Sequence, residues 1–161
     1  MSLSRNSLLD CTSLGAIEDV KQLISEGANV DQADISGRTP LMVAAAMKNH
    51  VLGRLLFAGG ASVNAQDQRG WSALNFAAQN PDVEFIRFLS HSNCSQEFVD
   101  VYGNSSLFRA VFNYRSDPSS IEELLSMGAN ANLKNKTDVS PRDLSNNIGN
   151  YDSKYLFQRL P

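Results

Sequence analysis

The chain has 161 residues, 42% of them hydrophobic and 19% charged, which favours one folded domain and excludes a wholly disordered chain. Its formal net charge is −3, without a cluster of lysines and arginines, so we expect no binding to nucleic acid. No apolar stretch is long enough for a membrane-spanning helix or a signal peptide, so we expect a cytoplasmic protein that has no membrane partner.

The clearest local signal is the segment SGRTPLMVAAA at residues 36–46, which has the pattern of a short helix entered from a turn. Thr39 predicts the N-cap, and Pro40 predicts the first helical residue, where the missing N–H of proline costs nothing. The leucine and alanines that follow place large and small apolar groups on one face of the helix. A second helix is expected over residues 51–59, and Gly60 should end it in a left-handed conformation.

The same pattern returns downstream at steps of 33 residues, so each copy predicts a helix, a turn, a second helix and an extended finger that ends in a turn. After residues 113–120, which we expect to contain a two-residue insertion, the register resumes with Asp138 in the glycine position of the turn. No copy can bury its apolar face alone, so stacking of neighbouring copies should build the core. The residues that keep the step are Asp34, Asp67 and Asp100, Gly37, Gly70 and Gly103, and Leu41, Leu74 and Leu107.

A 33-residue step with the motifs T-P-L-x-x-A and G-A-x-V-N resembles the ankyrin repeat. The resemblance implies an all-α solenoid of stacked helix-turn-helix units with β-turn or hairpin fingers. It covers most of the chain, as a single domain over residues 1–161 with about five repeats, of which the first and last act as caps. The approximate repeats are residues 4–36, 37–69, 70–102, 103–137 and 138–161.

No group of side chains in the sequence predicts catalysis or a bound cofactor. His50 and His91 lie in different repeats without cysteine or glutamate at ligand spacing, so we expect no metal site. Cys11 and Cys94 align with alanines in repeats that are not neighbours, so we expect small core side chains rather than a disulfide. A capping box that begins at Ser119 explains the paired glutamates after it. We therefore expect a protein that is not an enzyme.

A solenoid of this type offers an extended concave surface made of its finger tips and first helices. The positions on that surface flank the turn glycine or follow the paired alanines of the first helix, and several of them carry large apolar or aromatic side chains. Tryptophan, tyrosine and arginine are enriched in interface hot spots, so we expect this surface to bind another protein. The alternative is that such side chains pack back on neighbouring fingers. The predicted contact residues are Ile35, Arg38, Met47, Gln68, Arg69, Trp71, Gln79, Val101, Tyr102, Phe112 and Tyr114.

Two short segments indicate a kind of partner. Residues 109–113 and 150–152 resemble parts of small bacterial ankyrin proteins that serve as immunity proteins beside secreted polymorphic toxins. That resemblance implies a protein, monomeric when free, that covers the active site of a toxin enzyme, and the mild acidity of the chain would suit a basic target. The alternative is an adaptor or a secreted effector that binds a host or cellular protein without inhibiting it.

Overall fold

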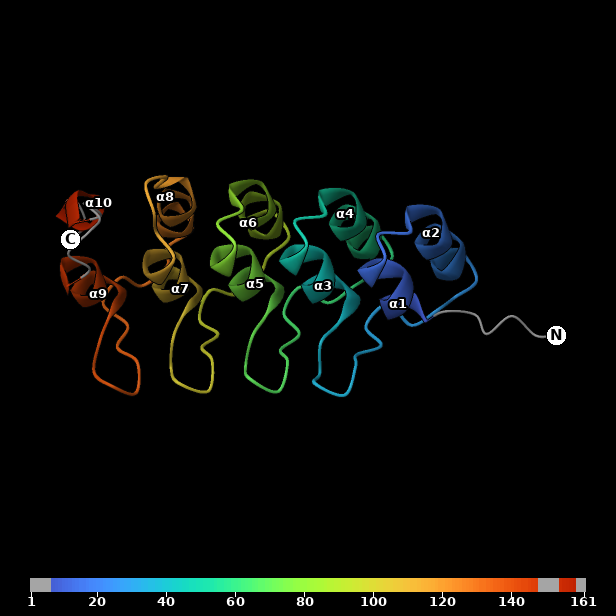
Figure 1. Ribbon diagram of the computed structural model, residues 1–161, viewed down its shortest axis with the longest axis horizontal. Helices are drawn as coiled ribbons and strands as arrows, with labels where there is room; N and C mark the ends of the chain where they lie inside the picture. The colour runs from blue at the N-terminus through green and yellow to red at the C-terminus, as the bar shows by residue number, and fades with distance from the viewer. Residues whose placement is uncertain (1–6, 148–153, 159–161) are drawn as a thin grey trace.

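The structure is a computed structural model that describes residues 7–147 and 154–158. In these residues the chain forms ten helices and no strand, apart from one isolated bridge between Val99 and Ser105, so the predicted all-α fold is confirmed. Figure 1 shows the helices as pairs that stand side by side in one row, with loops projecting from one side as fingers. The pairs are α1 (Leu8–Ser13) with α2 (Ile17–Ser25), α3 (Pro40–Ala46) with α4 (His50–Ala58), α5 (Ala73–Gln79) with α6 (Val83–Ser90), α7 (Ser106–Phe112) with α8 (Ser119–Ser126), and α9 (Pro141–Asn147) with α10 (Lys154–Gln158).

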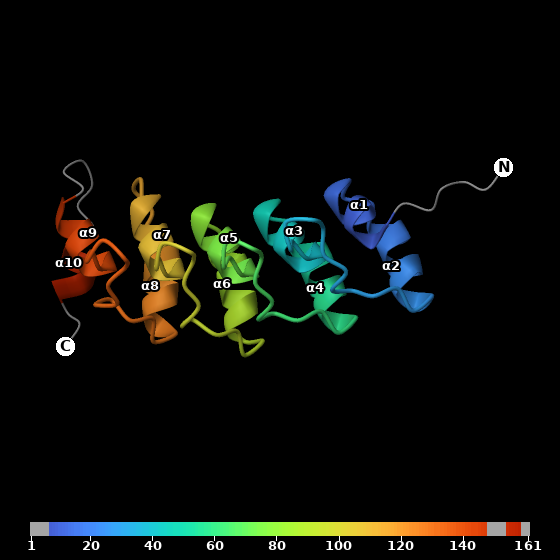
Figure 2. The same cartoon turned by 90° about the horizontal axis from the view of Figure 1, so that it is seen from below.

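The first helix of each pair lies next to the fingers, and the second lies farther from them (Figure 1). We call α1, α3, α5, α7 and α9 the inner helices and their partners the outer helices. Seen from the finger side, the pairs follow one another in chain order along the row (Figure 2). Consecutive repeats are therefore neighbours, as a solenoid requires. Residues 4–6 of the first predicted repeat and residues 148–153 and 159–161 of the last lie outside the described residues.

Short polar side chains cap several of the helices, and the start of one helix differs from the prediction. Thr39 Oγ1 accepts the N–H of Met42 at 3.4 Å, and Pro40 is the first residue of α3, as predicted. The capping box predicted at Ser119 is wrong. Asp117 Oδ1 accepts both the N–H of Ser119, at 3.0 Å, and its hydroxyl, at 2.6 Å. The hydroxyl therefore donates to an acidic neighbour in the preceding loop instead of accepting a hydrogen bond from the helix.

One short polar side chain closes each finger turn. Asp67 Oδ1 accepts the backbone N–H groups of Arg69 and Trp71, both at 2.9 Å. This Asx turn folds the finger back toward the next inner helix and keeps the Asp67 carboxylate inside the turn. The equivalent acceptors of the other fingers are Asp34, Asp100 and Asn135.

Backbone hydrogen bonds also join the tips of successive fingers. The N–H of Gln68 donates to the carbonyl oxygen of Ser36 at 2.9 Å. The same contact recurs one repeat later, so the fingers form one connected row rather than independent loops. The recurring pairs are Val101 with Arg69 and Lys136 with Tyr102, each at 2.9 Å.

The core lies between the inner and outer helices and across the contacts from one repeat to the next. The leucines that recur at 33-residue steps, Leu41, Leu74 and Leu107, are at most 1% exposed. Phe85 of α6 is fully buried and packs against the backbone of α4 at Gly53. A Cβ atom at Gly53 would lie 2.5 Å from Phe85 Cζ, so the ring occupies the space that any larger residue there would need.

Two glycines of one repeat allow a direct test of the contact between fingers. Gly70 has a φ of +76°, and a Cβ atom there would lie 2.8 Å from the carbonyl oxygen of Val99 in the next finger; Gly60 has a φ of +93° but open space around it. Alanine strains both left-handed positions, but only Gly70→Ala also forces two fingers apart. We expect Gly70→Ala to lower the free energy of unfolding by about 2 kcal/mol and Gly60→Ala by about 1 kcal/mol. Urea unfolding of both variants measures this, and equal losses would contradict it.

Candidate protein-binding face

The large apolar residues predicted to make contacts lie at finger tips and at the ends of inner helices. Ile35 and Tyr102, in two finger tips, are 96% and 67% exposed, and Phe112, the last residue of α7, is 59% exposed. Met47 and Val101 are exposed as well. Large apolar side chains that gather on one surface are typical of interaction sites. We call this surface the finger face and define it by Ile35, Arg38, Met47, Gln68, Arg69, Trp71, Gln79, Val101, Tyr102 and Phe112.

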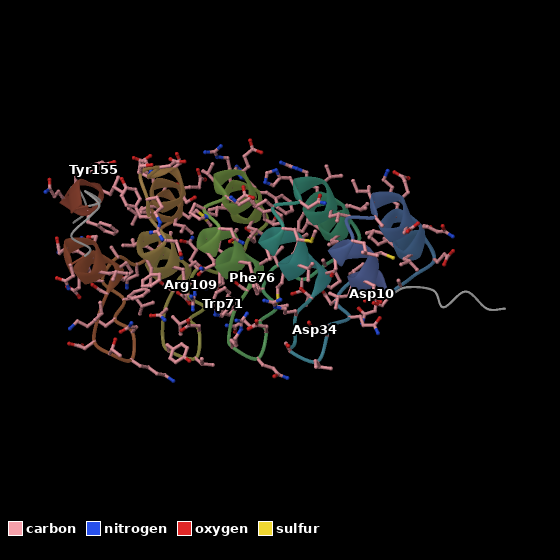
Figure 3. All side chains as sticks on the ribbon, in the orientation of Figure 1. Asp10, Asp34, Trp71, Phe76, Arg109 and Tyr155 are labelled. Atoms are coloured by element: carbon pink, nitrogen blue, oxygen red, sulfur yellow. The ribbon has the colours of Figure 1, made fainter. Side chains whose placement is uncertain are left out.

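Trp71 lies half-buried at the base of its finger, between the hydrophobic core and solvent. The centre of its ring is 5.0 Å from the centre of the Phe76 ring. The guanidinium carbons of Arg69 and Arg109 lie 4.6 Å and 3.8 Å from the centre of the Trp71 ring. Figure 3 shows Trp71, Phe76 and Arg109 together where the fingers meet α5 and α7. The indole is thus held by stacking on its neighbours rather than projecting freely.

A third arginine approaches the same aromatic pair. The guanidinium carbon of Arg38 is 4.9 Å from the centre of the Phe76 ring, and that of Arg69 is 5.9 Å from it. Three cationic side chains, two from successive fingers and one from α7, therefore surround two rings. We call Arg38, Arg69, Trp71, Phe76 and Arg109 the arginine–aromatic cluster.

Arg109 is anchored to the protein by a buried ion pair. Its guanidinium donates to the Asp100 carboxylate, and the two side chains are 16% and 0% exposed. It also donates to Gln79 Oε1 at 3.3 Å, which ties α7 to α5. Arg109 therefore fixes the position of the Trp71 ring and connects two adjacent repeats.

The Asp100 carboxylate is held in its ionised form. Burial alone would raise the pKa of Asp100, but hydrogen bonds from the backbone and side chain of Asn104, from the N–H of Tyr102 and from the Arg109 guanidinium outweigh burial and lower this pKa below its usual value. The carboxylate thus supplies a permanent negative charge beneath the cluster at neutral pH.

Tyr114 is not part of the finger face, contrary to prediction. It lies in the loop between α7 and α8, is only 7% exposed, and belongs to the hydrophobic core. Sequence reasoning also missed Phe76 and Arg109 as members of the candidate site. The available signal was their shared position in the repeat, since Val43, Phe76 and Arg109 occupy the same place in successive inner helices.

The histidines and cysteines have structural surroundings. His50 Nε2 lies 2.9 Å from Asp82 Oδ2, and His50 Nδ1 lies 3.4 Å from Glu84 Oε2, so His50 connects two repeats. Both Cys11 and Cys94 are free thiols, and burial raises the pKa of Cys94 to about 11. Across the described residues, no three histidine, cysteine or acidic side chains are placed to hold a metal ion. In the same part of the chain, no helix combines the length and apolar character needed to cross a bilayer.

A comparison with protein families agrees with the stacked helix pairs and their fingers. A family model described as "Ankyrin repeats (3 copies)" matches residues 8–92 and also residues 45–135. The chain belongs to the ankyrin repeat family. Ankyrin repeats are generally modules for protein–protein interaction rather than enzymes, so the family assignment indicates that this chain binds another protein.

Proteins similar in sequence to this chain are much longer than it is. "Ankyrin repeat and KH domain-containing protein mask-1" from Caenorhabditis elegans is 30% identical over 141 residues, which cover 86% of this chain and 5% of the relative. "Mitochondrial disaggregase" from Bos taurus is 28% identical over 142 residues, covering 85% and 20% of the two chains. "Rabankyrin-5" from Homo sapiens is 33% identical over 144 residues, covering 85% and 12%. The chain spans a small part of each relative, so the similarity does not extend to the activity of the whole proteins.

Proposed function

We propose that this ankyrin repeat protein is a non-enzymatic interaction module that binds a partner protein through the finger face. The observation that carries the proposal is the exposure of Ile35, Tyr102 and Phe112 around a cluster of arginine and aromatic side chains. These residue types dominate the energetics of protein interfaces. A row of connected fingers offers a broad surface, which suits a protein better than a small molecule.

We further propose that binding acts by occupancy, as in an immunity protein that sterically blocks a toxin enzyme. The segment 109–113, which carries the resemblance to bacterial immunity proteins, contributes Phe112 to the finger face and Arg109 to the arginine–aromatic cluster. Residues 150–152, which carry the rest of it, lie outside the described residues. The relatives named above come from animals, so a bacterial origin rests on that resemblance alone. The cytoplasmic location and the monomeric state also stay predictions.

The test compares aromatic residues on the two sides of the solenoid, with the protein that co-purifies from the native source as ligand. We expect Tyr102→Ala combined with Phe112→Ala to weaken binding at least about 30-fold, because truncation of interface hot spots costs 2 kcal/mol or more. The control is Phe57→Ala, since Phe57 is 40% exposed but lies on the outer helix α4.

The co-purified partner also allows an inhibitor to be distinguished from an adaptor. If the captured partner is an enzyme whose activity falls as the ankyrin repeat protein is added, the inhibitor is supported. Unchanged activity at full occupancy would favour an adaptor or effector instead. Binding that depends on Phe57 and not on Tyr102 and Phe112 would contradict the finger face as the site.

A further inference from the structure

The arginine–aromatic cluster presents positive charge to solvent and keeps its negative charge inside. The side chains of Asp67 and Asp100 are 1% and 0% exposed, and each carboxylate accepts two backbone N–H groups within its finger turn. The Arg69 side chain, by contrast, is 51% exposed, and its contacts with Asp67 are long, at 3.3 Å and 3.4 Å. Asp67 and Asp100 therefore hold the cluster in position from inside the protein and do not cover its exposed positive charge.

Of the three arginines in the cluster, Arg38 makes the fewest polar contacts through its side chain. In the described residues its guanidinium contacts the Phe76 ring but has no hydrogen-bond or ion-pair partner. The exposed carboxylate of Asp34, in the same finger, accepts the backbone N–H of Arg38 but lies beyond ion-pair distance of the guanidinium. Within residues 7–147 and 154–158, no group accepts a hydrogen bond from the five N–H donors of the Arg38 guanidinium, so these donors can bind a ligand.

Stacking prepares these arginines for one kind of ligand. A guanidinium that lies over an aromatic ring loses part of its side-chain freedom before binding, which lowers the entropy cost of forming new hydrogen bonds. Its planar edge still presents donors that match the two oxygens of a carboxylate. Arg38 and Arg69 share the Phe76 ring and can therefore bind neighbouring carboxylates or one carboxylate together.

We propose that the finger face selects a partner segment that carries aspartate or glutamate side chains, with Arg38 and Arg69 binding their carboxylates. The inference rests on the proposed function and adds the chemistry of the partner. It also reverses the expectation from the net charge of −3, which favours a basic target. The charge near the contact, rather than the net charge, governs which partner segment binds, because the fields of exposed charges are screened beyond about 8 Å at physiological salt.

Nucleic acid is the competing ligand for an arginine-rich surface. Single-stranded nucleic acid needs open aromatic faces on which bases can stack. Trp71 is half-buried and has two guanidiniums over its ring, and Phe76 is only 4% exposed. The exposed apolar side chains around the cluster, such as Tyr102 and Phe112, instead suit the apolar residues of a polypeptide.

The test selects peptides from a random display library on the full chain and measures their affinity through the fluorescence of Trp71, the single tryptophan of the protein. We expect the selected peptides to be enriched in aspartate and glutamate. Replacing their acidic residues by asparagine and glutamine should weaken binding at least about tenfold, as should Arg38→Gln combined with Arg69→Gln. The matched control is Arg54→Gln, because Arg54 also stacks on an aromatic ring, that of Phe88 at 5.3 Å, but on the outer side.

Several results would overturn the inference. These are the absence of any selected peptide, peptides without acidic enrichment, an equal loss with Arg54→Gln, or tighter binding of oligouridine than of the acidic peptides. The double variant with Tyr102→Ala and Phe112→Ala distinguishes a failure of the acidic preference from a failure of the proposed function. Neutral peptides that still need Tyr102 and Phe112 would leave the finger face intact and remove only the acidic preference.

Discussion

Replacing Asp100 by alanine is expected to lower the free energy of unfolding by about 3–5 kcal/mol, because it leaves the Arg109 guanidinium largely buried without its counter-ion. The same change removes the acceptor for the N–H groups of Tyr102 and Asn104, which close the finger turn. Urea unfolding at neutral pH, followed by far-UV circular dichroism and by Trp71 fluorescence, measures the loss. A loss below about 1 kcal/mol would contradict the structural role assigned to Asp100.

Asp100→Asn distinguishes the contribution of the finger turn to stability from that of the ion pair. The next finger shows that an amide can close this turn, since Asn135 Oδ1 accepts the N–H groups of Thr137 and Val139 at 3.0 Å and 3.1 Å. The asparagine variant should therefore lose only the ion pair and cost clearly less than the alanine variant. Identical losses for the two variants would show that the turn contributes nothing.

The ion pair also has a defined pH dependence. The folded-state pKa of Asp100 lies below its usual value of 3.8, so ionised Asp100 stabilises the fold at every pH above that value. This contribution is lost as the pH falls through the folded-state pKa. The stability difference between the wild-type protein and Asp100→Asn should accordingly stay constant near neutral pH and shrink only below about pH 4.

Phe85→Ala is the second change with a large expected effect, about 3–5 kcal/mol of the free energy of unfolding. Phe85 is fully buried between α4 and α6, and its ring packs on the rings of His50 and Phe88, 5.8 Å and 5.6 Å away between ring centres. Removing the ring leaves a cavity at the boundary between two repeats. Chemical unfolding measures the loss, and a loss below about 1.5 kcal/mol would contradict the packing described here.

Gly53 provides the matched test of that packing. Gly53→Ala should destabilise the wild-type protein by about 1–3 kcal/mol, although alanine is the better helix former, because the new methyl group meets the Phe85 ring. In the Phe85→Ala protein the same substitution meets open space and should become stabilising, by up to about 1 kcal/mol. A double-mutant cycle measures this change of sign, and additive effects would refute direct contact between the two positions.

Features that repeat along the chain could be predicted from the sequence. The aspartates and glycines of the finger turns recur at a fixed step, and even Asp138 adopts a left-handed φ of +62° in the glycine position. Such positions depend on the local backbone conformation, and the residues that set this conformation recur in each repeat. The exposure of Ile35 and Tyr102 follows from the same regularity, because the finger tips occupy equivalent places in each copy.

Features that occur once could not be predicted in this way. Tyr114 lies in the loop that carries the insertion, so no other repeat shows where its side chain goes. The acceptor for the N–H of Ser119, the first residue of α8, is Asp117 of the same loop. The arginine–aromatic cluster combines side chains from three repeats, and only their arrangement in space brings Arg38 and Arg109 to one aromatic pair.

Hydrogen–deuterium exchange of the full chain, with and without the protein that co-purifies with it, tests most directly where a partner sits. If the finger face is the binding site, the complex should slow exchange in the finger segments 35–38, 68–71 and 101–104 and leave the outer helices α4, α6 and α8 unchanged. Protection confined to those outer helices, with the fingers exchanging as in the free protein, would place the partner on the opposite side of the solenoid.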